Sequence, residues 1–565
     1  MSGIARVTAG ALTGAAIAGA IAPLTKRFFG PPTGGVGVLT VYGYPKGWDF
    51  AVIALLVTFA AIGGAIAGAA WRAEYAERVT PPAQDARRLW LLAGIVFIVM
   101  LFVHDHPYAH MDPFHEGEHL TPAYLFHHGE RPFRDVFLLH GLGVDGGLDA
   151  LVVGDPPAPL RSRRLQTVLD AATLALLIPV AAEVTAMTWS LIAAIVLSLC
   201  GIAALWLPVF PYYRLAPLLL TAYGLFLWIR KRKPLPLLLA FISASIGLLW
   251  SLDVGTYAIA GLIAALILIR PPLKQVLLFG AIAAAIPILA LLAMQVNLRQ
   301  FFVDAYLILP KVNNAAGALP APELKSAAGL RYYLPPVFYG LLLALAWKRR
   351  DPRIAIVAIF SILLFRTAAG RVGWSHTRFA MPFLGIAFVG FILEPLRNRI
   401  AIALLSIAAL FYFEVPQNAL AGAKLLAEWP SRQRHEGLVK HPLARGIYTS
   451  EDNAIQLSSL KSYVDALGPG TIFDFTNERA LYFMLRRKPP TRCFDVPTLS
   501  SPVLLEEALQ QLDAHPPVAV ILGGEPSVAV FDGVSNEQRV PRLAQWIEAN
   551  YPRRTAVGRF IVATR

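Results

Sequence analysis

The chain has little charge and almost no cysteine for its length. Asp, Glu, Lys and Arg make up 15% of its 565 residues, whereas an ordinary soluble domain has about 25%. Together with a high apolar content, this composition excludes a disordered chain, a collagen and a coiled coil. The two cysteines, Cys200 and Cys493, lie far apart in the sequence, so they imply no disulfide framework.

Apolar residues account for 56% of the chain, and its mean hydropathy is +0.56. A bilayer core of about 30 Å requires about 20 apolar residues per helix. We therefore expect a polytopic α-helical membrane protein with about 13 transmembrane helices. The candidate segments are residues 4–23, 50–70, 89–104, 165–183, 188–207, 214–229, 235–251, 254–269, 276–296, 335–347, 354–367, 378–394 and 400–414. The first of them lacks the cleavage site of a signal peptide, so we expect it to be retained.

Basic residues outnumber acidic ones by 50 to 36, which gives a net charge of +14. In a soluble protein this excess would suggest a nucleic-acid partner. Here it lies in short loops between apolar segments, which favours topology signals and contacts with anionic membrane lipids instead. Because basic loops face the cytoplasm, we expect a cytoplasmic N-terminus and an external C-terminus. The loops that set this orientation contain Arg72, Arg78, Arg87, Arg88, residues 230–233, Arg270, Lys274, residues 348–353, Arg397 and Arg399.

Three regions follow from the pattern. Residues 1–88 form a transmembrane hairpin and a cytoplasmic loop, in which Gly10, Gly14, Gly64 and Gly68 let two helices approach closely. Residues 89–415 form a transmembrane core with an outer loop at 105–164. Residues 416–565 regain charge and form an external α/β domain. Its strands are expected at 471–475, 518–522 and 560–563, with helices at 504–512 and 541–550.

The outer loop at 105–164 and the residue just before it hold eight of the twelve histidines, together with many carboxylates. One interpretation is a metal site, because His115-Glu116-Gly117-Glu118-His119 satisfies the HExxH pattern of zinc proteases. No third ligand is evident downstream, so the metal remains unassigned. The loop ends in Arg161, Arg163 and Arg164, which we interpret as anchors for lipid headgroups.

The second interpretation is glycosyl transfer, because the loop resembles the GT-C superfamily of membrane glycosyltransferases. That family has one or two acids in its first outer loop, then a G-x-x-P-[YF]-x-D element and a His/Pro-rich turn. The matching residues here are Asp112 and Glu116, then residues 129–135 (GERPFRD), then His140-Gly141. Residues 250–255, 366–378, 477–483 and 486–492 also resemble family segments, so the resemblance covers about 89–565.

The resemblance implies an inverting transfer of a sugar from a polyprenyl-phosphate-linked donor to an acceptor on a glycan, lipid or protein, at the outer face of a bacterial inner membrane. Asp112 is the first choice for the general base and Glu116 the second. Substrate-binding residues are expected at His115, His119, Asp135, His140, Asp253, Arg366, Arg371, His376 and Arg378. No cofactor is fixed, and a divalent cation stays open. The alternatives are a transporter or flippase of lipid-linked sugars and a membrane zinc metalloprotease.

Overall fold

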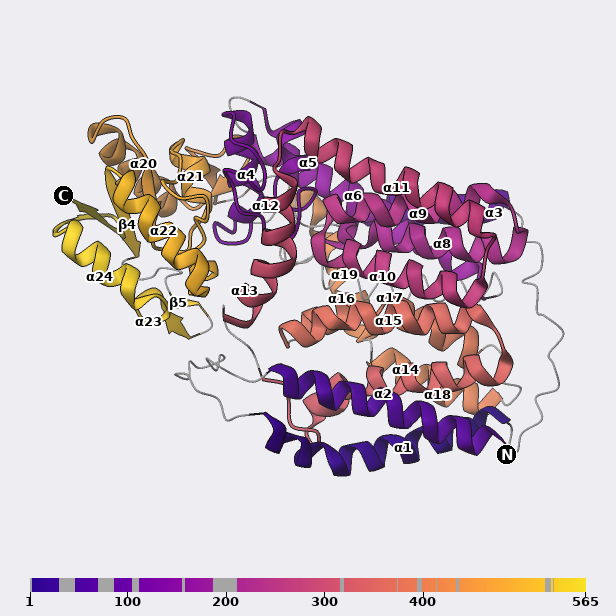
Figure 1. Ribbon diagram of the computed structural model, residues 1–565. Helices are drawn as coiled ribbons and strands as arrows, with labels where there is room; N and C mark the ends of the chain where they lie inside the picture. The colour runs from indigo at the N-terminus through magenta and orange to yellow at the C-terminus, as the bar shows by residue number, and fades with distance from the viewer. Residues whose placement is uncertain are drawn as a thin grey trace.

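The computed structural model describes most of the chain as one helical bundle with a mixed α/β unit at one end (Figure 1). The described residues are 3–29, 46–69, 86–103, 111–154, 158–185, 211–315, 320–372, 374–393, 399–412, 414–432, 435, 437–523, 530–531 and 533–565. The segment expected at 188–207 lies outside them, as do the loop residues 105–110.

Twelve of the thirteen expected segments coincide with helices. Among the described residues, seven helices are long and apolar enough to cross a membrane by length and composition, and three shorter apolar helices accompany them. The polytopic helical fold is thus confirmed, while the total of thirteen stays a prediction. The helices that coincide with the expected segments are α1 Gly3–Thr25, α2 Lys46–Ala69, α3 Ala86–Val103, α6 Pro159–Ala182, α8 Ala216–Lys231, α9 Pro234–Trp250, α10 Leu252–Ile269, α11 Leu273–Ala293, α14 Ala327–Arg349, α15 Pro352–Gly370, α16 Trp374–Phe379, α17 Pro382–Ala387 and α18 Arg399–Tyr412. Both α16 and α17 overlap the segment expected at 378–394.

Helices α1 and α2 pack tightly along their glycines, as expected. A Cβ added at Gly10 would lie 2.3 Å from the carbonyl oxygen of Gly63, and one at Gly14 would lie 2.0 Å from that of Phe59. No side chain fits at such backbone contacts. The small residues therefore bring the two backbones together, which is how helices associate where the hydrophobic effect gives no preference.

Many apolar side chains on the outer helices face away from the protein. Leu277 and Leu289 of α11 and Ile400 and Leu404 of α18 are all more than half exposed. A soluble monomer rarely exposes contiguous apolar surfaces of this kind. The pattern fits a bundle surrounded by lipid.

Two glycines bring the end of α9 and the start of α10 close together, and their turn contacts the outer loop. Gly247 and Gly255 pack backbone to backbone, with a notional Cβ on Gly255 only 2.1 Å from the Gly247 carbonyl oxygen. The amide of Leu252 donates a 2.6 Å hydrogen bond to the carbonyl of His140, and the amide of Gly143 donates a hydrogen bond to the carbonyl of Leu249. The backbone of the outer loop is thereby fastened to the turn between these two helices.

The outer loop itself contains two short helices, α4 Gly117–His127 and α5 Gly147–Val153. Gly146 precedes α5 with φ of 90°, a conformation that favours glycine. A Cβ there would meet the backbone of His119 at 2.5 Å and that of Ala123 at 2.6 Å. This close approach sets α5 against α4 and brings their polar side chains together.

Residues 437–565 form the expected α/β domain, apart from residues 524–529 and 532, which are not described. Its sheet has the order β3-β4-β8-β7, with β3 parallel to β4 and the other pairs antiparallel. The strands are β3 Ile472–Asp474, β4 Ala519–Gly523, β7 Arg553–Val557 and β8 Phe560–Thr564, so every expected strand is present. The expected helices appear as α22 Pro502–Ala514 and α24 Pro541–Asn550, and α20 Glu451–Ala466 and α21 Ala480–Leu485 are additional. Two two-stranded pairs flank this sheet: β1 Val439–Lys440 with β2 Tyr448–Thr449, and β5 Val530–Phe531 with β6 Val534–Ser535.

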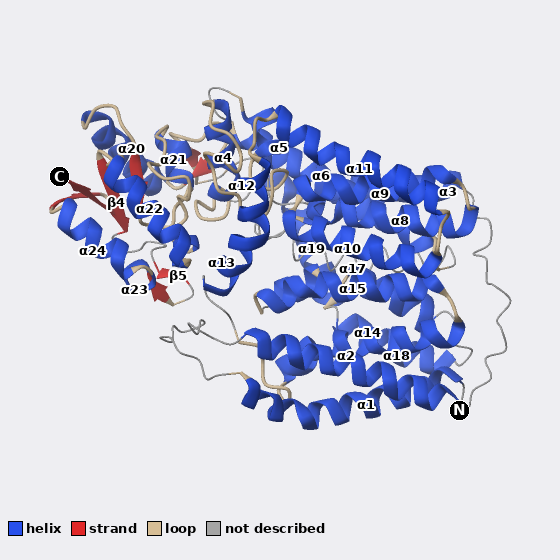
Figure 2. Ribbon diagram, in the orientation of Figure 1, coloured by secondary structure: helices blue, strands red, loops and turns tan. Residues whose placement is uncertain are grey.

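The α/β domain and the outer loop share one hydrophobic core. Leu120 and Phe133 of the loop cluster with Leu460, Tyr482 and Val562 of the domain. Figure 2 shows the strands at one end of the bundle, beside α4 and α12, Leu298–Phe302. A helix that was not expected, α19 Val415–Arg432, connects α18 to this domain. The two chain ends lie at opposite ends of the molecule (Figure 1).

Candidate active site

Asp112 and His115 form a hydrogen-bonded pair at the start of the outer loop. Asp112 Oδ1 accepts hydrogen bonds from the amides of Phe114 and His115, and Oδ2 lies 2.6 Å from His115 Nδ1. Burial alone would raise the pKa of Asp112, but the hydrogen bonds and charge of His115 outweigh it, so this pKa is lowered. Both side chains keep an open surface, 37% for Asp112 and 24% for His115. The pair can therefore meet a substrate as a carboxylate and an imidazole held in one orientation.

Glu116 has a different environment from the neighbouring Asp112. Its two carboxylate oxygens accept hydrogen bonds from Arg163 Nε at 2.6 Å and from a terminal nitrogen of Arg163 at 2.8 Å. Both side chains are 1% exposed. Oε2 also accepts the amide of Asp112 at 2.9 Å, so Glu116 fixes the backbone that carries Asp112. The interpretation of Arg163 as a lipid anchor is therefore wrong, because its guanidinium is buried in this ion pair.

The HExxH pattern does not form the expected helical pair of histidines. Helix α4 begins at Gly117, so His115 precedes it and points to Asp112 instead. His119 is buried and lies 3.5 Å from Asp149, with Gln166 bonded to both. Burial lowers the pKa of His119, but the charge of Asp149 outweighs it and raises that pKa. Among the described residues, no three His, Cys, Asp or Glu side chains come together as metal ligands.

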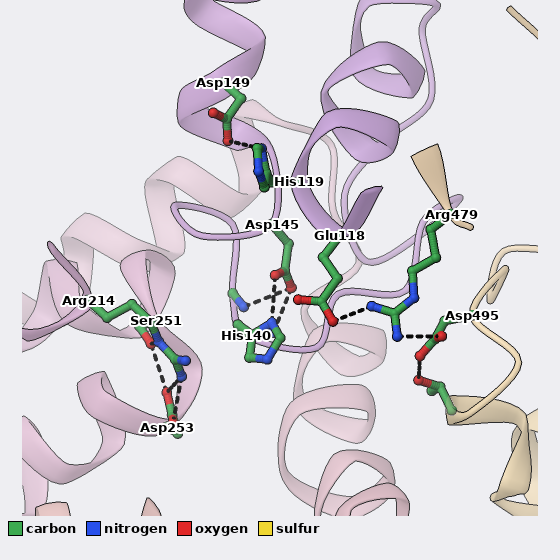
Figure 3. A network of polar contacts seen from close by, with 12 residues as sticks. Glu118, His119, His140, Asp145, Asp149, Arg214, Ser251, Asp253, Arg479 and Asp495 are labelled. Carbon is green, nitrogen blue, oxygen red and sulfur yellow. Dashed lines mark hydrogen bonds and ion pairs between the residues drawn. The ribbon is translucent and has the colours of Figure 1, made fainter. Parts of the chain in front are cut away.

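Glu118, Asp145 and His140 extend the polar loop towards the membrane helices. His140 Nδ1 is 2.9 Å from Asp145 Oδ1, and the charge of Asp145 raises the pKa of His140 against the effect of burial. Glu118 is paired with Arg479 of the α/β domain, and Figure 3 shows its carboxylate between Arg479 and the His140–Asp145 pair. Burial would raise the pKa of Glu118, yet Arg479 lowers it to about 2.

Asp135 bonds within its own turn of the loop. Its Oδ2 accepts the amide of Arg131 at 3.0 Å, and its Oδ1 lies 3.3 Å from Arg134 Nε. Pro132 and Val136 form an isolated bridge around it. Asp135 thus closes the turn of the GERPFRD element, and its role as a substrate-binding residue stays a prediction.

Asp253 lies next to the loop at the first turn of α10, in a network with Arg214. One terminal nitrogen of Arg214 donates to both carboxylate oxygens at 2.8 Å, and Ser251 donates to Asp253 at 2.7 Å (Figure 3). Since Leu252 bonds to the carbonyl of His140, this network lies directly beside the part of the loop that carries His140. Arg214 belongs to the short helix η2 Tyr212–Leu215, directly before α8.

The expected basic residues gather at the same end of the bundle, near Arg214. Burial and the positive charges of Arg371, Arg214 and Lys46 lower the pKa of His376 to about 3. Arg366 packs over the ring of Phe50, and its charge acts on Lys46, which is paired with Asp49 at 3.1 Å. We name Lys46, Arg214, Arg366, Arg371 and His376 the basic cluster. Arg378 pairs instead with Glu414, which also binds Arg331.

The sequence did not predict the partners of several polar residues in this region. Arg163 and Arg214 stand at the starts of apolar helices, where a buried charge close to a membrane indicates a functional or paired role. Asp145 and Asp149 belong to the acid-rich loop but match no motif. Nothing in the sequence indicates that Arg479, 361 positions after Glu118, lies against it.

The chain matches no family model and no curated protein. Solved structures do match it. ArnT from Cupriavidus metallidurans bound to undecaprenyl phosphate is 12% identical, with a TM-score of 0.46 over 85% of this chain and 98% of that chain. The apo state of the same protein is 10% identical, with a TM-score of 0.44 over 85% of this chain and 98% of that chain. Arabinosyltransferase EmbB from Mycobacterium smegmatis is 17% identical, with a TM-score of 0.38 over 72% of this chain and 46% of that chain. These TM-scores lie below 0.5, so the roles proposed next depend on the residues of this chain.

Proposed function

We propose that the chain is a membrane glycosyltransferase that moves a sugar from a polyprenyl-phosphate-linked donor to an acceptor hydroxyl, with inversion. The observation that carries this proposal is the meeting of an acidic loop and the basic cluster at one end of the bundle. Transfer needs a group that accepts the proton of the attacking hydroxyl, and cations that meet the charge of the leaving phosphate. The resemblance of the loop motifs to the GT-C superfamily supports the same reaction.

The Asp112–His115 pair accepts the proton in this mechanism. The acceptor oxygen attacks the anomeric carbon as the bond to the phosphate oxygen breaks, and that oxygen keeps the electron pair. The proton of the hydroxyl passes to the pair, whose carboxylate stays ionised because its pKa is lowered. A single attack opposite the leaving group inverts the sugar. Glu116 is less suited as the base, because both of its oxygens are engaged by Arg163.

The basic cluster receives the phosphate. Lys46, Arg366 and Arg371 supply positive charge, and His376 is neutral at physiological pH, since its pKa is about 3. A neutral imidazole can still donate one hydrogen bond to a phosphate oxygen. Placing the phosphate at the ends of apolar helices leaves the polyprenyl chain in the bilayer and the sugar at the outer loop. We place this face outside the inner membrane, following the distribution of basic loops.

The phosphate site is tested by binding of undecaprenyl phosphate to the purified protein in nanodiscs. Native mass spectrometry should show at least about tenfold weaker binding to Arg371→Ala, the factor that corresponds to one lost charge-assisted contact of about 1.4 kcal/mol. Arg270→Ala is the matched control, because Arg270 ends α10 far from the loop. Equal binding by the two variants would remove the basic cluster from the site.

Turnover is tested with a panel of undecaprenyl-phosphate monosaccharides, by measuring released undecaprenyl phosphate with and without EDTA. Asp112→Asn should lower turnover by roughly 10²–10⁴-fold, because the amide cannot accept the proton. Asp452→Asn, a surface change on α20, is the control. Stoichiometric zinc that is lost in both His115→Ala and His119→Ala, together with a fully active Asp112→Asn, would favour the metalloprotease instead.

A further inference from the structure

Arg479 joins the α/β domain to the outer loop through a buried ion network. Its side chain is only 4% exposed, and it pairs with Glu118 of α4 and with Asp495 of its own domain. The distance to Asp495 is 2.7 Å, and the guanidinium lies 4.0 Å from the ring centroid of Phe114. Arg479 therefore contacts Phe114 and Glu118, which precede and follow His115 in the sequence.

The backbone around Arg479 makes further contacts with the same segment. Its carbonyl accepts a 2.7 Å hydrogen bond from the hydroxyl of Thr121, and the amide of Ala480 donates to the carbonyl of Pro113 at 2.9 Å. A Cβ on Gly117 would lie 2.3 Å from the amide nitrogen of Ala480. These contacts surround residues 113–121 and leave the start of α4 little freedom to move.

The charge of Arg479 also balances the carboxylates around the pair. Glu118 and Glu116 lie on the loop near His115, while Glu478 of the α/β domain lies close enough to Asp112 to sense its charge and is paired with Arg559. Glu118 in turn acts on His140 and His115. Without Arg479, the negative charge of Glu118 would act unopposed on His140 and favour its protonated form.

We propose that Arg479 is a positioning residue for glycosyl transfer, which holds the Asp112–His115 pair in place. This inference rests on the proposed function. It assigns to the α/β domain a direct part in the site, although that domain lies at the far end of the sequence. Arg479 acts through Glu118, Phe114 and the backbone, and it is not itself assigned a contact with substrate.

Arg492 offers a matched control. It is also a buried arginine of the α/β domain, paired with two carboxylates, Asp304 and Glu507, each at 2.6 Å. Like Arg479 it contacts the outer loop, since its carbonyl accepts the amide of Phe137. The guanidinium of Arg492 also lies over the ring of Phe137 and donates to the carbonyl of Phe133. A change at Arg492 therefore removes comparable packing and charge pairing, but at residues 133–137 of the loop and not at residues 113–121.

The experiment compares Arg479→Gln, Arg479→Lys and Arg492→Gln on the undecaprenyl-phosphate sugar that the wild-type protein turns over. Arg479→Gln should lower kcat about 10²-fold, the usual effect of a small misplacement of reacting groups, with the KM of the donor unchanged. Arg479→Lys should restore most of the lost kcat, because it restores the positive charge that pairs with Glu118. Equal kcat values for Arg479→Gln and Arg492→Gln would overturn the proposal.

Amide hydrogen exchange separates this proposal from the proposed function. Peptides from residues 111–128 should exchange faster in Arg479→Gln than in Arg492→Gln, with no substrate present. If the wild-type protein turns over none of the panel, the proposed function fails, while unchanged exchange in Arg479→Gln would by itself overturn the positioning role.

Discussion

Glu116 illustrates how one residue can match a catalytic motif and yet have a structural environment. It lies in both the HExxH pattern and the acid pair of the glycosyl-transfer motif, but its carboxylate is 1% exposed and bound on both oxygens by Arg163. A buried ion pair of this kind contributes little net stability by itself, whereas removal of one partner leaves an uncompensated charge. Its role is therefore best tested by stability as well as by activity.

Glu116→Gln should lower the free energy of unfolding by about 3–5 kcal/mol, because Arg163 then stays buried without a counter-ion. The measurement is unfolding in detergent followed by tryptophan fluorescence. Glu130→Gln is the control, since Glu130 pairs with Lys488 at the surface and should cost about 0–1 kcal/mol. A similar small loss for both variants would contradict the buried pair. The double variant Glu116→Gln, Arg163→Met should recover part of the loss.

Asp474 should make the α/β domain less stable as the pH rises. Its carboxyl group is 1% exposed, and burial raises its pKa to about 7. Because the folded state binds this proton more tightly than the unfolded state, the stabilisation is complete below about pH 4 and is lost as the pH rises through 7. The loss is roughly 4 kcal/mol at most, at about 1.36 kcal/mol for each tenfold change in proton affinity.

Thermal unfolding between pH 5 and pH 8 measures this effect. The wild-type protein should lose stability over that range, while Asp474→Asn should show a smaller change. Asp452→Asn, on the exposed face of α20, should follow the wild type. Parallel pH profiles for all three proteins would show that Asp474 titrates in its ordinary range.

At the scale of secondary structure, the start of α4 depends on one glycine. Gly117 packs directly against the backbone of Arg479 and Ala480, where a Cβ would meet atoms at 2.3–2.6 Å. Gly117→Ala should therefore cost about 1–3 kcal/mol of stability through overpacking, and it should lower turnover by moving the segment that carries His115.

Gly94→Ala in α3 is the matched control, because nothing lies within 4 Å of a Cβ there. That change should be neutral or slightly stabilising, since Ala is favoured over Gly in a helix interior by up to about 1 kcal/mol. Thermal unfolding of both variants in detergent checks the comparison. A neutral Gly117→Ala would mean that α4 and α21 do not pack as closely as described.

At the scale of the whole molecule, the loop helices α4 and α5 and the α/β domain lie at one end of the bundle (Figure 1). Helix α9 ends at this site, so its other end, beside residues 230–233, lies at the opposite end of the bundle. We expect that opposite end to be cytoplasmic, because basic residues concentrate in cytoplasmic loops.

Reporter fusions test this orientation. Alkaline phosphatase fused after Arg565 should be active, because it folds only outside the cytoplasm, and green fluorescent protein fused after Lys231 should be fluorescent, because it folds inside. The control exchanges the two reporters. Alkaline phosphatase fused after Lys231 should then be inactive, and green fluorescent protein fused after Arg565 should not fluoresce. Phosphatase activity at Lys231 would reverse the predicted topology and place the acidic loop in the cytoplasm.

The sequence alone determined the features that depend on local composition. Runs of apolar residues predict the membrane helices because each must be apolar over a bilayer-spanning length, and the glycines of α1 and α2 predict their close packing. Short apolar runs and turn signals likewise located β3, β4 and β8 and the helices α22 and α24. The dense His and acid content located the polar loop, including Asp112 and His140.

Tertiary structure alone decided which of those polar residues are partnered, and by what. Glu116 lies four residues after Asp112, but only folding brings Arg163, 47 positions further on, to its carboxylate. Arg479 pairs with Glu118, which lies 361 positions earlier in the sequence. Lys46 lies close enough to Arg366 and His376 for their charges to interact, although the three residues belong to three separate helices. Such pairings follow from packing over long separations in sequence, which periodicity and motif spacing do not encode, because those patterns report only on neighbours within one helix or strand.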